Sequence, residues 1–191
     1  QKGYVPALLG EYKESFVRGT GYATEIGSFE IKKTEDANKG VYIVDGILGG
    51  LKAYADYASN VLTCYYGSSK QNFTVSADFA KISATGGVSL GGVTINSYGG
   101  IYNAVRAQGA PTLTAEEEAL VGTYNESWKY QKSYGATVED VTSNNGMMIS
   151  ASDEAAYGRL KVTFLSKGGS YTCYANLSGS SLNVLSSGAN H

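Results

Sequence analysis

Apolar and polar residues alternate along most of the chain, and this alternation predicts β-strands. Successive side chains of a strand point to opposite faces, so apolar residues at every second position indicate a strand with one buried face. The alternating sets are Phe29 and Ile31, Val41 and Ile43, Phe73 to Phe79, Val93 and Ile95, Ile101 and Val105, and Leu160, Val162 and Phe164. The pattern predicts an all-β chain of antiparallel strands.

Glycine- and asparagine-rich segments separate these sets, at the spacing of about 8–12 residues that is typical of an antiparallel meander. They lie at residues 37–40, 86–87, 91–92, 99–100, 143–146 and 168–169. Asn145 and Gly146 both tolerate positive φ, so we expect them to form a tight type I′ hairpin.

One segment, Thr114–Leu120, favours a short helix. Thr114 can accept a hydrogen bond from the first turn, Glu117 can complete a capping box, and the acidic residues complement the helix dipole. The segment follows Pro111, so we expect a first β-module at residues 1–110 and a second, shorter one at 111–191. The stretch at about 86–110 has no counterpart later in the chain and is expected to add strands to the first module.

Two parts of the sequence occur twice. Leu9–Phe16 and Val121–Trp128 share four identities in eight positions. A second similarity keeps its spacing without a gap and joins Leu51-Lys52 and Thr63-Cys64-Tyr65 to Leu160-Lys161 and Thr172-Cys173-Tyr174. A duplicated structural unit is the economical explanation, and each copy is expected to be a small sandwich or open barrel.

Both copies open with Gly-x-Tyr, at Gly10–Tyr12 and Gly122–Tyr124. A short helical turn followed by Gly-x-aromatic resembles the opening of lipocalin-like (calycin) barrels, although the second copy has about 75 residues, too few for eight strands. Gly40–Ile43 and Leu62-Thr63 also resemble strands in tandem β-modules of secreted proteins and lipoproteins from gut Bacteroidetes. This resemblance implies a secreted or surface-exposed protein and brings no catalytic residue.

Composition and charge narrow the classes of partner. The 191 residues carry a net charge of −2, with scattered lysines and arginines that form no basic stripe, which argues against nucleic acid and anionic membranes. No apolar run approaches the roughly 18 residues of a membrane span. The 16 tyrosines, the 25 glycines and a start at Gln1 rather than methionine favour an exported chain in the periplasm, at the cell surface or outside the cell. An upstream signal peptide or lipid anchor stays open.

The two cysteines, Cys64 and Cys173, occupy the same place in the second repeated segment. Equivalent positions of two separate cores are usually far apart, whereas a disulfide needs Cα atoms within about 7 Å. We therefore expect two buried free thiols. A disulfide stays open if the repeats meet at this strand.

The chain offers little for catalysis, cofactors or metals. A Ser or Cys nucleophile needs an imidazole to relay its proton, and the only histidine is the terminal His191. A glycosidase needs only two carboxylates, but the candidates form no local motif: Glu14, Asp45, Asp56, Asp78, Glu126 and Asp153. The loop at residues 35–40 contains a lysine and lacks the closing bidentate glutamate of a calcium loop. We expect no enzyme, no cofactor and no metal.

The repeated opening strand supplies the candidate binding residues. Alternation places three side chains on one face in each copy: Tyr12, Glu14 and Phe16, and Tyr124, Glu126 and Trp128. Aromatic rings beside a carboxylate suit a sugar, because the rings stack on pyranose faces and the carboxylate accepts from hydroxyls. The alternative is structural: the rings belong to the core and the glutamate reaches water or a backbone amide, because an unpaired buried carboxylate is costly. We predict a module that binds a glycan or other small extracellular ligand, or an interaction domain of a surface assembly.

Overall fold

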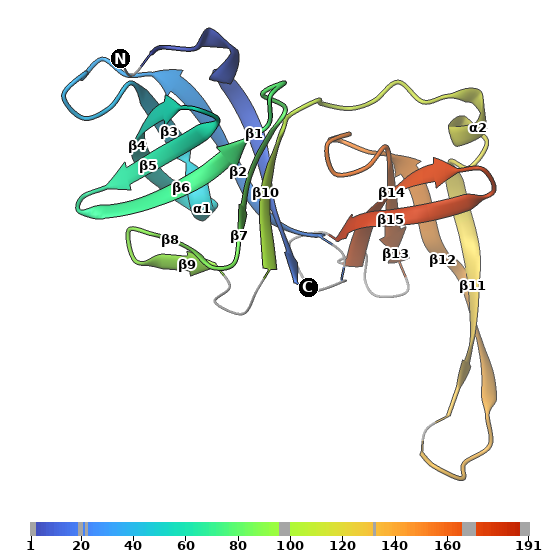
Figure 1. Ribbon diagram of the computed structural model, residues 1–191. Coiled ribbons are helices and arrows are strands. Elements are labelled where there is room, and N and C mark those ends of the chain that lie inside the picture. The colour runs from blue at the N-terminus through green and yellow to red at the C-terminus, as the bar shows by residue number, and fades with distance from the viewer. Residues whose placement is uncertain are drawn as a thin grey trace. The chain divides into compact units, whose positions relative to one another are not determined.

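The computed structural model describes residues 3–18, 21, 23–95, 100–131, 133–165 and 171–187. The turn signals at Gly99, Gly168 and Gly169 and the histidine at position 191 lie outside these residues. The chain is all-β, as predicted, and divides into two compact units, residues 1–108 (unit 1) and 109–191 (unit 2) (Figure 1).

Unit 1 is a closed antiparallel barrel of eight strands. In the order of the ring they are β1 (Gly10–Arg18), β10 (Gly100–Arg106), β7 (Lys81–Thr85), β6 (Ser69–Val75), β5 (Val61–Tyr66), β4 (Leu51–Ala58), β3 (Tyr42–Gly46) and β2 (Ala23–Lys33). Pairing of β1 with β2 closes the ring. The barrel therefore continues the meander that the alternation predicts, and only the segment between β7 and β10 interrupts it.

The interior of the barrel contains three fully buried tyrosines, Tyr12, Tyr42 and Tyr102. Two of them correct the sequence prediction, which assigned Val41 and Ile43 to the buried face of β3 and Ile101 and Val105 to that of β10. The adjacent positions face the core instead. A tyrosine can be buried when its hydroxyl has a partner, and the Tyr42 hydroxyl accepts a hydrogen bond from the backbone of Val5 at 2.6 Å.

The ends of the barrel are covered by short elements of unit 1 (Figure 1). The 3₁₀ helix η1 (Pro6–Leu8) buries Leu8 at one end. At the other end the hairpin of β8 (Val88–Leu90) and β9 (Val93–Ile95) adds the fully buried side chains of Val88 and Leu90 to the same core. The stretch at 86–110 thus supplies β8, β9 and β10.

Unit 2 is a five-stranded antiparallel sheet preceded by the short helix α2 (Ala115–Glu118). The capping box predicted for this helix is confirmed: the Thr114 side chain accepts from the Glu117 backbone, and the Glu117 carboxylate accepts from the Thr114 backbone. The strands are β11 (Gly122–Tyr130), β12 (Glu139–Ala151), β13 (Leu160–Phe164), β14 (Tyr171–Ser178) and β15 (Ser181–Ser187), and each pairs with the next.

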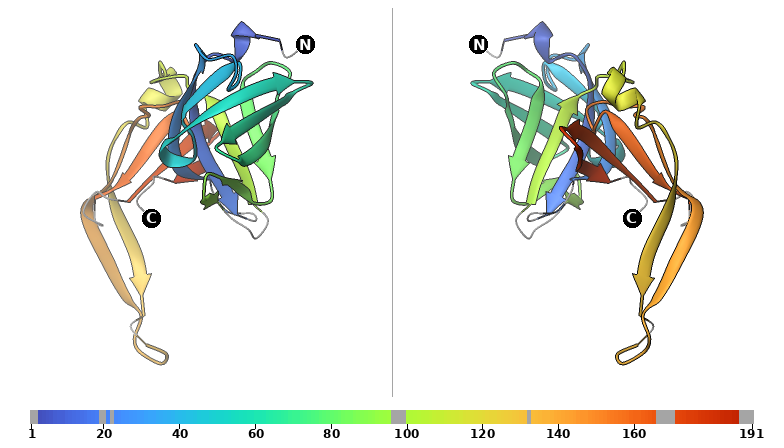
Figure 2. Two further views of the ribbon diagram at one scale, coloured as in Figure 1. Left: turned by 90° about the vertical axis from the view of Figure 1, so that its left-hand side faces the viewer. Right: turned by 90° about the vertical axis from the view of Figure 1, so that its right-hand side faces the viewer.

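The hairpin of β11 and β12 extends well beyond the other strands of unit 2 (Figure 2). β12 pairs with β13 only over Met147–Ala151, whereas β11 and β12 stay paired out to Tyr130 and Glu139. We call this two-stranded part, residues 126–130 and 139–143, the ribbon. The predicted type I′ hairpin at Asn145 is wrong: Asn145 lies inside β12 with φ of 54°. Its positive φ accompanies the register shift in the pairing of β11 with β12 and does not form a turn.

The second repeated segment is also placed differently from the prediction. Cys64 lies on β5, the fifth strand of unit 1, whereas Cys173 lies on β14, the fourth strand of unit 2. Cys173 pairs with Val162 on the third strand of unit 2, whereas Cys64 pairs with Ala55 on the fourth strand of unit 1. The ungapped match between the two cysteine segments therefore does not connect strands of the same order in the two units.

Candidate functional site

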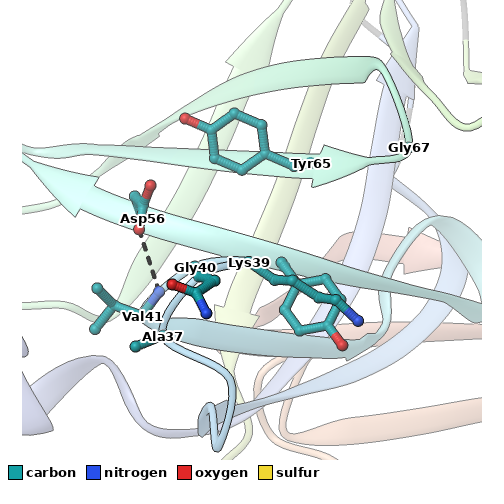
Figure 3. Close-up of a pocket in the computed structure, with 9 residues that line it drawn as sticks. Ala37, Lys39, Gly40, Val41, Asp56, Tyr65 and Gly67 are labelled. Carbon is teal, nitrogen blue, oxygen red and sulfur yellow. Dashed lines mark hydrogen bonds between the residues drawn. The ribbon is translucent and has the colours of Figure 1, made fainter.

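The outer wall of the barrel carries an open groove with a volume of about 870 Å³. It lies between the loop that joins β2 to β3 and the strands β4 and β5. In Figure 3 the loop residues Lys39 and Val41 lie on one side and Tyr65 on the other, with Asp56 between them. The complete lining is Ala37, Asn38, Lys39, Gly40, Val41, Tyr54, Asp56, Tyr65 and Gly67.

Two tyrosines form the floor of the groove. Tyr54 on β4 and Tyr65 on β5 are direct cross-strand partners, and both side chains are half-buried. Their neighbours Ala53, Ala55 and Cys64 are fully buried in the barrel. Because successive side chains of a strand point to opposite faces, Tyr54 and Tyr65 point outward. The closed sheet thus places the two tyrosines opposite each other on adjacent strands, each of which is paired on both sides.

Charged groups border the rings. The Lys39 ammonium lies 5.5 Å from the centre of the Tyr54 ring, within the range of a cation–π contact, and 3.5 Å from the Asp36 carboxylate. The Asp56 carboxylate is buried and accepts a hydrogen bond of 3.2 Å from the backbone of Val41. The groove therefore combines two aromatic faces with one cation and one carboxylate.

Gly40 fixes the loop against the barrel wall. Its φ is +150°, and a Cβ at this position would lie 3.0 Å from the Ala55 carbonyl oxygen. Only glycine permits this close approach of the loop to β4. The segment 35–40, which has a weak calcium-loop pattern in the sequence, is therefore the loop that lines the groove.

Two of the three residues of the predicted stripe on β1, Tyr12 and Glu14, face the barrel interior. Tyr12 and Glu14 are fully buried and Phe16 is half-buried. The Tyr12 hydroxyl donates to the Leu8 carbonyl at 3.0 Å, and the pairing of β1 with β2 shifts register after Glu14. Tyr12 and Glu14 are therefore not on an accessible binding face.

Glu14 has a specific set of partners inside the barrel. Its carboxylate accepts hydrogen bonds from the Leu48 and Gly49 backbones, at 2.8 and 3.4 Å, and from the Tyr102 hydroxyl at 2.5 Å. Leu48 and Gly49 follow β3 in the turn α1 (Ile47–Gly50) and both have left-handed φ, so their N–H groups converge on the carboxylate. Burial raises the pKa of Glu14, while the hydrogen bonds from Tyr102, Leu48 and Gly49 oppose the rise.

The predicted stripe on β11 is divided. Tyr124 is half-buried and packs on the core of unit 2, and its hydroxyl donates to the Leu120 carbonyl at 2.6 Å. Beyond a register shift, Glu126 and Trp128 lie on the ribbon, where Trp128 is 40% exposed. The structure thus leaves Trp128 accessible and assigns Tyr124 to packing.

The groove residues Tyr54, Tyr65, Asp56 and Lys39 were not selected as a site from the sequence. In the sequence, Asp56 is only one of several isolated carboxylates. The available signal in β4 is Tyr54 between the two small apolar residues Ala53 and Ala55. That signal becomes specific only when the register of β4 and β5 is known.

The cysteines and carboxylates of the described residues form no disulfide and no metal-binding cluster. Both cysteines are free, with Cys64 fully buried and Cys173 half-buried, and burial raises the pKa of each thiol. Cys173 is less covered than expected because it lies in the five-stranded sheet and not in a closed barrel. Among the described residues there is no group of three or more metal-ligating side chains. None of the helices in the described part of the chain is long and apolar enough to cross a membrane.

An all-β chain with one closed eight-stranded barrel and an aromatic groove on its wall is the class that these observations define. Comparison of the chain with family models, curated proteins and solved structures finds no match.

Proposed function

We propose that the chain is a non-enzymatic, exported binding module whose groove on unit 1 takes a saccharide. The observation that carries this proposal is the cross-strand pair Tyr54 and Tyr65, half-buried on the outer wall of the barrel where both line the groove. A groove of about 870 Å³ also falls within the roughly 300–1,000 Å³ of typical small-ligand sites.

The chemistry of the groove suits a sugar ring. Tyrosine offers an apolar ring face for the C–H groups of a pyranose and a hydroxyl for its polar edge. The Asp56 carboxylate can accept hydrogen bonds from sugar hydroxyls, and the Lys39 ammonium can donate to ring or substituent oxygens. An export compartment is supported by the composition alone, through the many tyrosines and glycines and the low share of charged residues.

A glycan array followed by calorimetry on the best ligand tests the proposal. Tyr65→Ala is expected to weaken binding about tenfold or more, because a stacked ring contributes on the order of 1–2 kcal/mol. Tyr65→Phe keeps the ring and is expected to retain most of the affinity. Tyr171→Ala, which removes an exposed tyrosine of unit 2, is the matched control and should bind like the parent chain.

Two results would contradict the saccharide site. One is the absence of any glycan bound by the folded chain. The other is a bound glycan whose affinity is the same for Tyr65→Ala and for the control Tyr171→Ala. Circular dichroism of each variant shows whether it has folded.

The ribbon favours a second candidate function, an interaction domain of a surface assembly. Trp128 and Tyr130 are large apolar side chains that are 40% and 48% exposed on a two-stranded extension. Exposed aromatic residues are enriched in protein interfaces. This function and the saccharide groove use different units of the chain.

We also propose that the two units derive from one duplicated module. Equivalent hydrogen bonds support this: Tyr12 to Leu8 in unit 1, and Tyr124 to Leu120 in unit 2. Each pair of residues has a separation of four along the chain.

A second set of equivalent contacts follows the second strand of each unit. The Thr34 hydroxyl accepts from the Asp36 backbone at 3.0 Å, and the Ser152 hydroxyl accepts from the Glu154 backbone at 3.0 Å. After each turn comes a glycine of positive φ, Gly40 or Gly158, that packs on the neighbouring strand. On this proposal β11 to β15 correspond to β1 to β5, and unit 2 has no counterpart of β6, β7 and β10.

The resemblance of the opening segment to lipocalin-like barrels stays a proposal of the same kind. Its support in unit 1 is the up-and-down order of the eight barrel strands and the start of β1 at Gly10, two residues before Tyr12. A solved structure of a relative with the same strand order and the same helical turn would strengthen it.

A further inference from the structure

The outer edge of β11 is available for pairing. β11 is the last strand in the order of its sheet, and among the described residues only β12 pairs with it. An unpaired strand edge presents a row of N–H and C=O groups that can bind another strand. The ribbon consists of only two strands, and isolated two-stranded hairpins are marginally stable in water.

The side chains of the ribbon separate into two faces. Glu126, Trp128 and Tyr130 lie opposite Ser143, Val141 and Glu139, so these six side chains share one face. Ser127 and Lys129 lie opposite Thr142 and Asp140 on the other face. One face is therefore aromatic and acidic, and the other is polar with a Lys129–Asp140 cross-strand pair of opposite charge.

We propose that a second copy of this chain pairs with β11, antiparallel to it and about a twofold axis. Such a pairing extends two ribbons into one four-stranded sheet and supplies each with the third strand that it lacks. This interface is independent of the saccharide groove.

Of the four registers centred on Glu126, Ser127, Trp128 and Lys129, the charges of β11 permit two for this self-pairing. A twofold axis at Ser127 places Glu126 opposite Trp128 of the second copy, and Asn125 opposite its Lys129. An axis at Trp128 places the two Trp128 rings opposite each other, and Ser127 opposite Lys129. Neither register places like charges directly opposite, which would be destabilising. Axes at Glu126 or Lys129 would pair like charges, so the sequence excludes them.

Both permitted registers bring aromatic side chains together, and of these Trp128 and Tyr130 are exposed whereas Tyr124 is half-buried. The Ser127 register places Tyr124 near Tyr130 of the second copy, and the Trp128 register pairs the two tryptophans. Aromatic cross-strand pairs are among the favourable pairs of antiparallel sheets. Because β11 complements itself in this way, a copy of the chain is the occupant that the strand favours.

Sedimentation velocity from low micromolar to millimolar concentration tests the proposal. The parent chain is expected to show a reversible monomer–dimer equilibrium. In the Ser127 register, Ser127→Lys places the new lysine opposite the same lysine of the second copy. In the Trp128 register it places the new lysine opposite Lys129. Both are pairs of like charge, so the substitution should weaken dimerisation about fivefold or more. Thr142→Lys adds the same charge to the same ribbon, but on β12, and should dimerise like the parent chain.

A second substitution at the same position distinguishes the registers. Ser127→Asp opposes an identical aspartate in the Ser127 register but meets Lys129 in the Trp128 register. Weaker dimerisation assigns the first register and stronger dimerisation the second, and both support the proposal. Trp128→Ala should weaken dimerisation in either register, and it supplies the test if Ser127→Lys fails to fold.

A parent chain that stays monomeric over the whole range overturns the proposal, even if a strand of another protein binds at β11. A dimer that is equally stable in Ser127→Lys, Trp128→Ala and Thr142→Lys also overturns it, because its interface then lies elsewhere.

Discussion

Replacement of Glu14 tests how the barrel keeps a carboxyl group in its interior. Glu14→Ala removes the acceptor for the Leu48 and Gly49 N–H groups and for the Tyr102 hydroxyl. A buried donor without a partner costs about 1–3 kcal/mol, and the cavity adds to this, so we expect a loss of about 3–5 kcal/mol. Glu14→Gln keeps one acceptor oxygen and the shape of the side chain, so it should cost about 1 kcal/mol in acid.

The pH dependence of Glu14→Gln has a definite sign. Burial raises the pKa of Glu14 in the folded barrel above its ordinary value of 4.5. The folded state therefore binds the proton more tightly than the unfolded state does. The resulting stabilisation is complete below pH 4.5 and is lost as the pH rises through the raised pKa. Relative to the parent chain, Glu14→Gln should gain up to about 1.4 kcal/mol per pH unit in that window.

The buried thiol of Cys64 provides the assay. It lies in the same core and is fully buried, so a pyridyl disulfide reacts with it only when the barrel opens. In a Cys173→Ser background, the labelling rate divided by that of the unfolded chain gives the free energy of opening at each pH. Glu11→Gln is the control, because Glu11 lies on the same strand with its side chain 50% exposed.

Parallel curves of opening free energy against pH for the parent chain and Glu14→Gln would refute a raised pKa. A loss below about 1 kcal/mol in Glu14→Ala would refute the role of its hydrogen bonds.

Two further predictions concern unit 2 and the proposed duplication. Hydrogen bonds from Arg159 lower the pKa of Glu117 to about 2, so its stabilisation is present above pH 4.5 and is lost as the pH falls toward 2. Arg159→Ala should therefore lower the free energy of unfolding at pH 7 and change it little near pH 2, as measured by chemical denaturation. Gly40→Ala and Gly158→Ala should each cost about 2–4 kcal/mol, because a Cβ would lie within 3.0 Å of the next strand's backbone at positive φ. A Cβ at Gly67 would have no atom within 4 Å, so Gly67→Ala should reduce the stability less. A similarly small loss of stability for all three substitutions would count against equivalent roles of Gly40 and Gly158.

The fold class and the helix cap followed from short-range patterns. Alternation identifies strands because neighbouring side chains point to opposite faces, and the Thr114–Glu117 capping box depends on residues three apart. The buried face of β3 could not be assigned in this way, because Tyr42 and Val41 are both compatible with a core position. The choice depends on whether a distant donor, the Val5 backbone, reaches the tyrosine hydroxyl.

The candidate site depended on longer-range information. Tyr54 and Tyr65 are separated by ten residues and become neighbours only through the register of β4 and β5. Glu14 receives hydrogen bonds from residues 34, 35 and 88 positions away. The alternation on β1 did indicate that Tyr12 and Glu14 share one face, but whether that face is core or surface is decided by closure of the barrel.

The position of Trp128 makes the chain its own optical reporter. It is the only tryptophan, and it lies on the ribbon with two-fifths of its surface in solvent. Its emission will therefore shift to shorter wavelength when a molecule covers this part of β11. Native fluorescence can thus follow one surface of the molecule without a label.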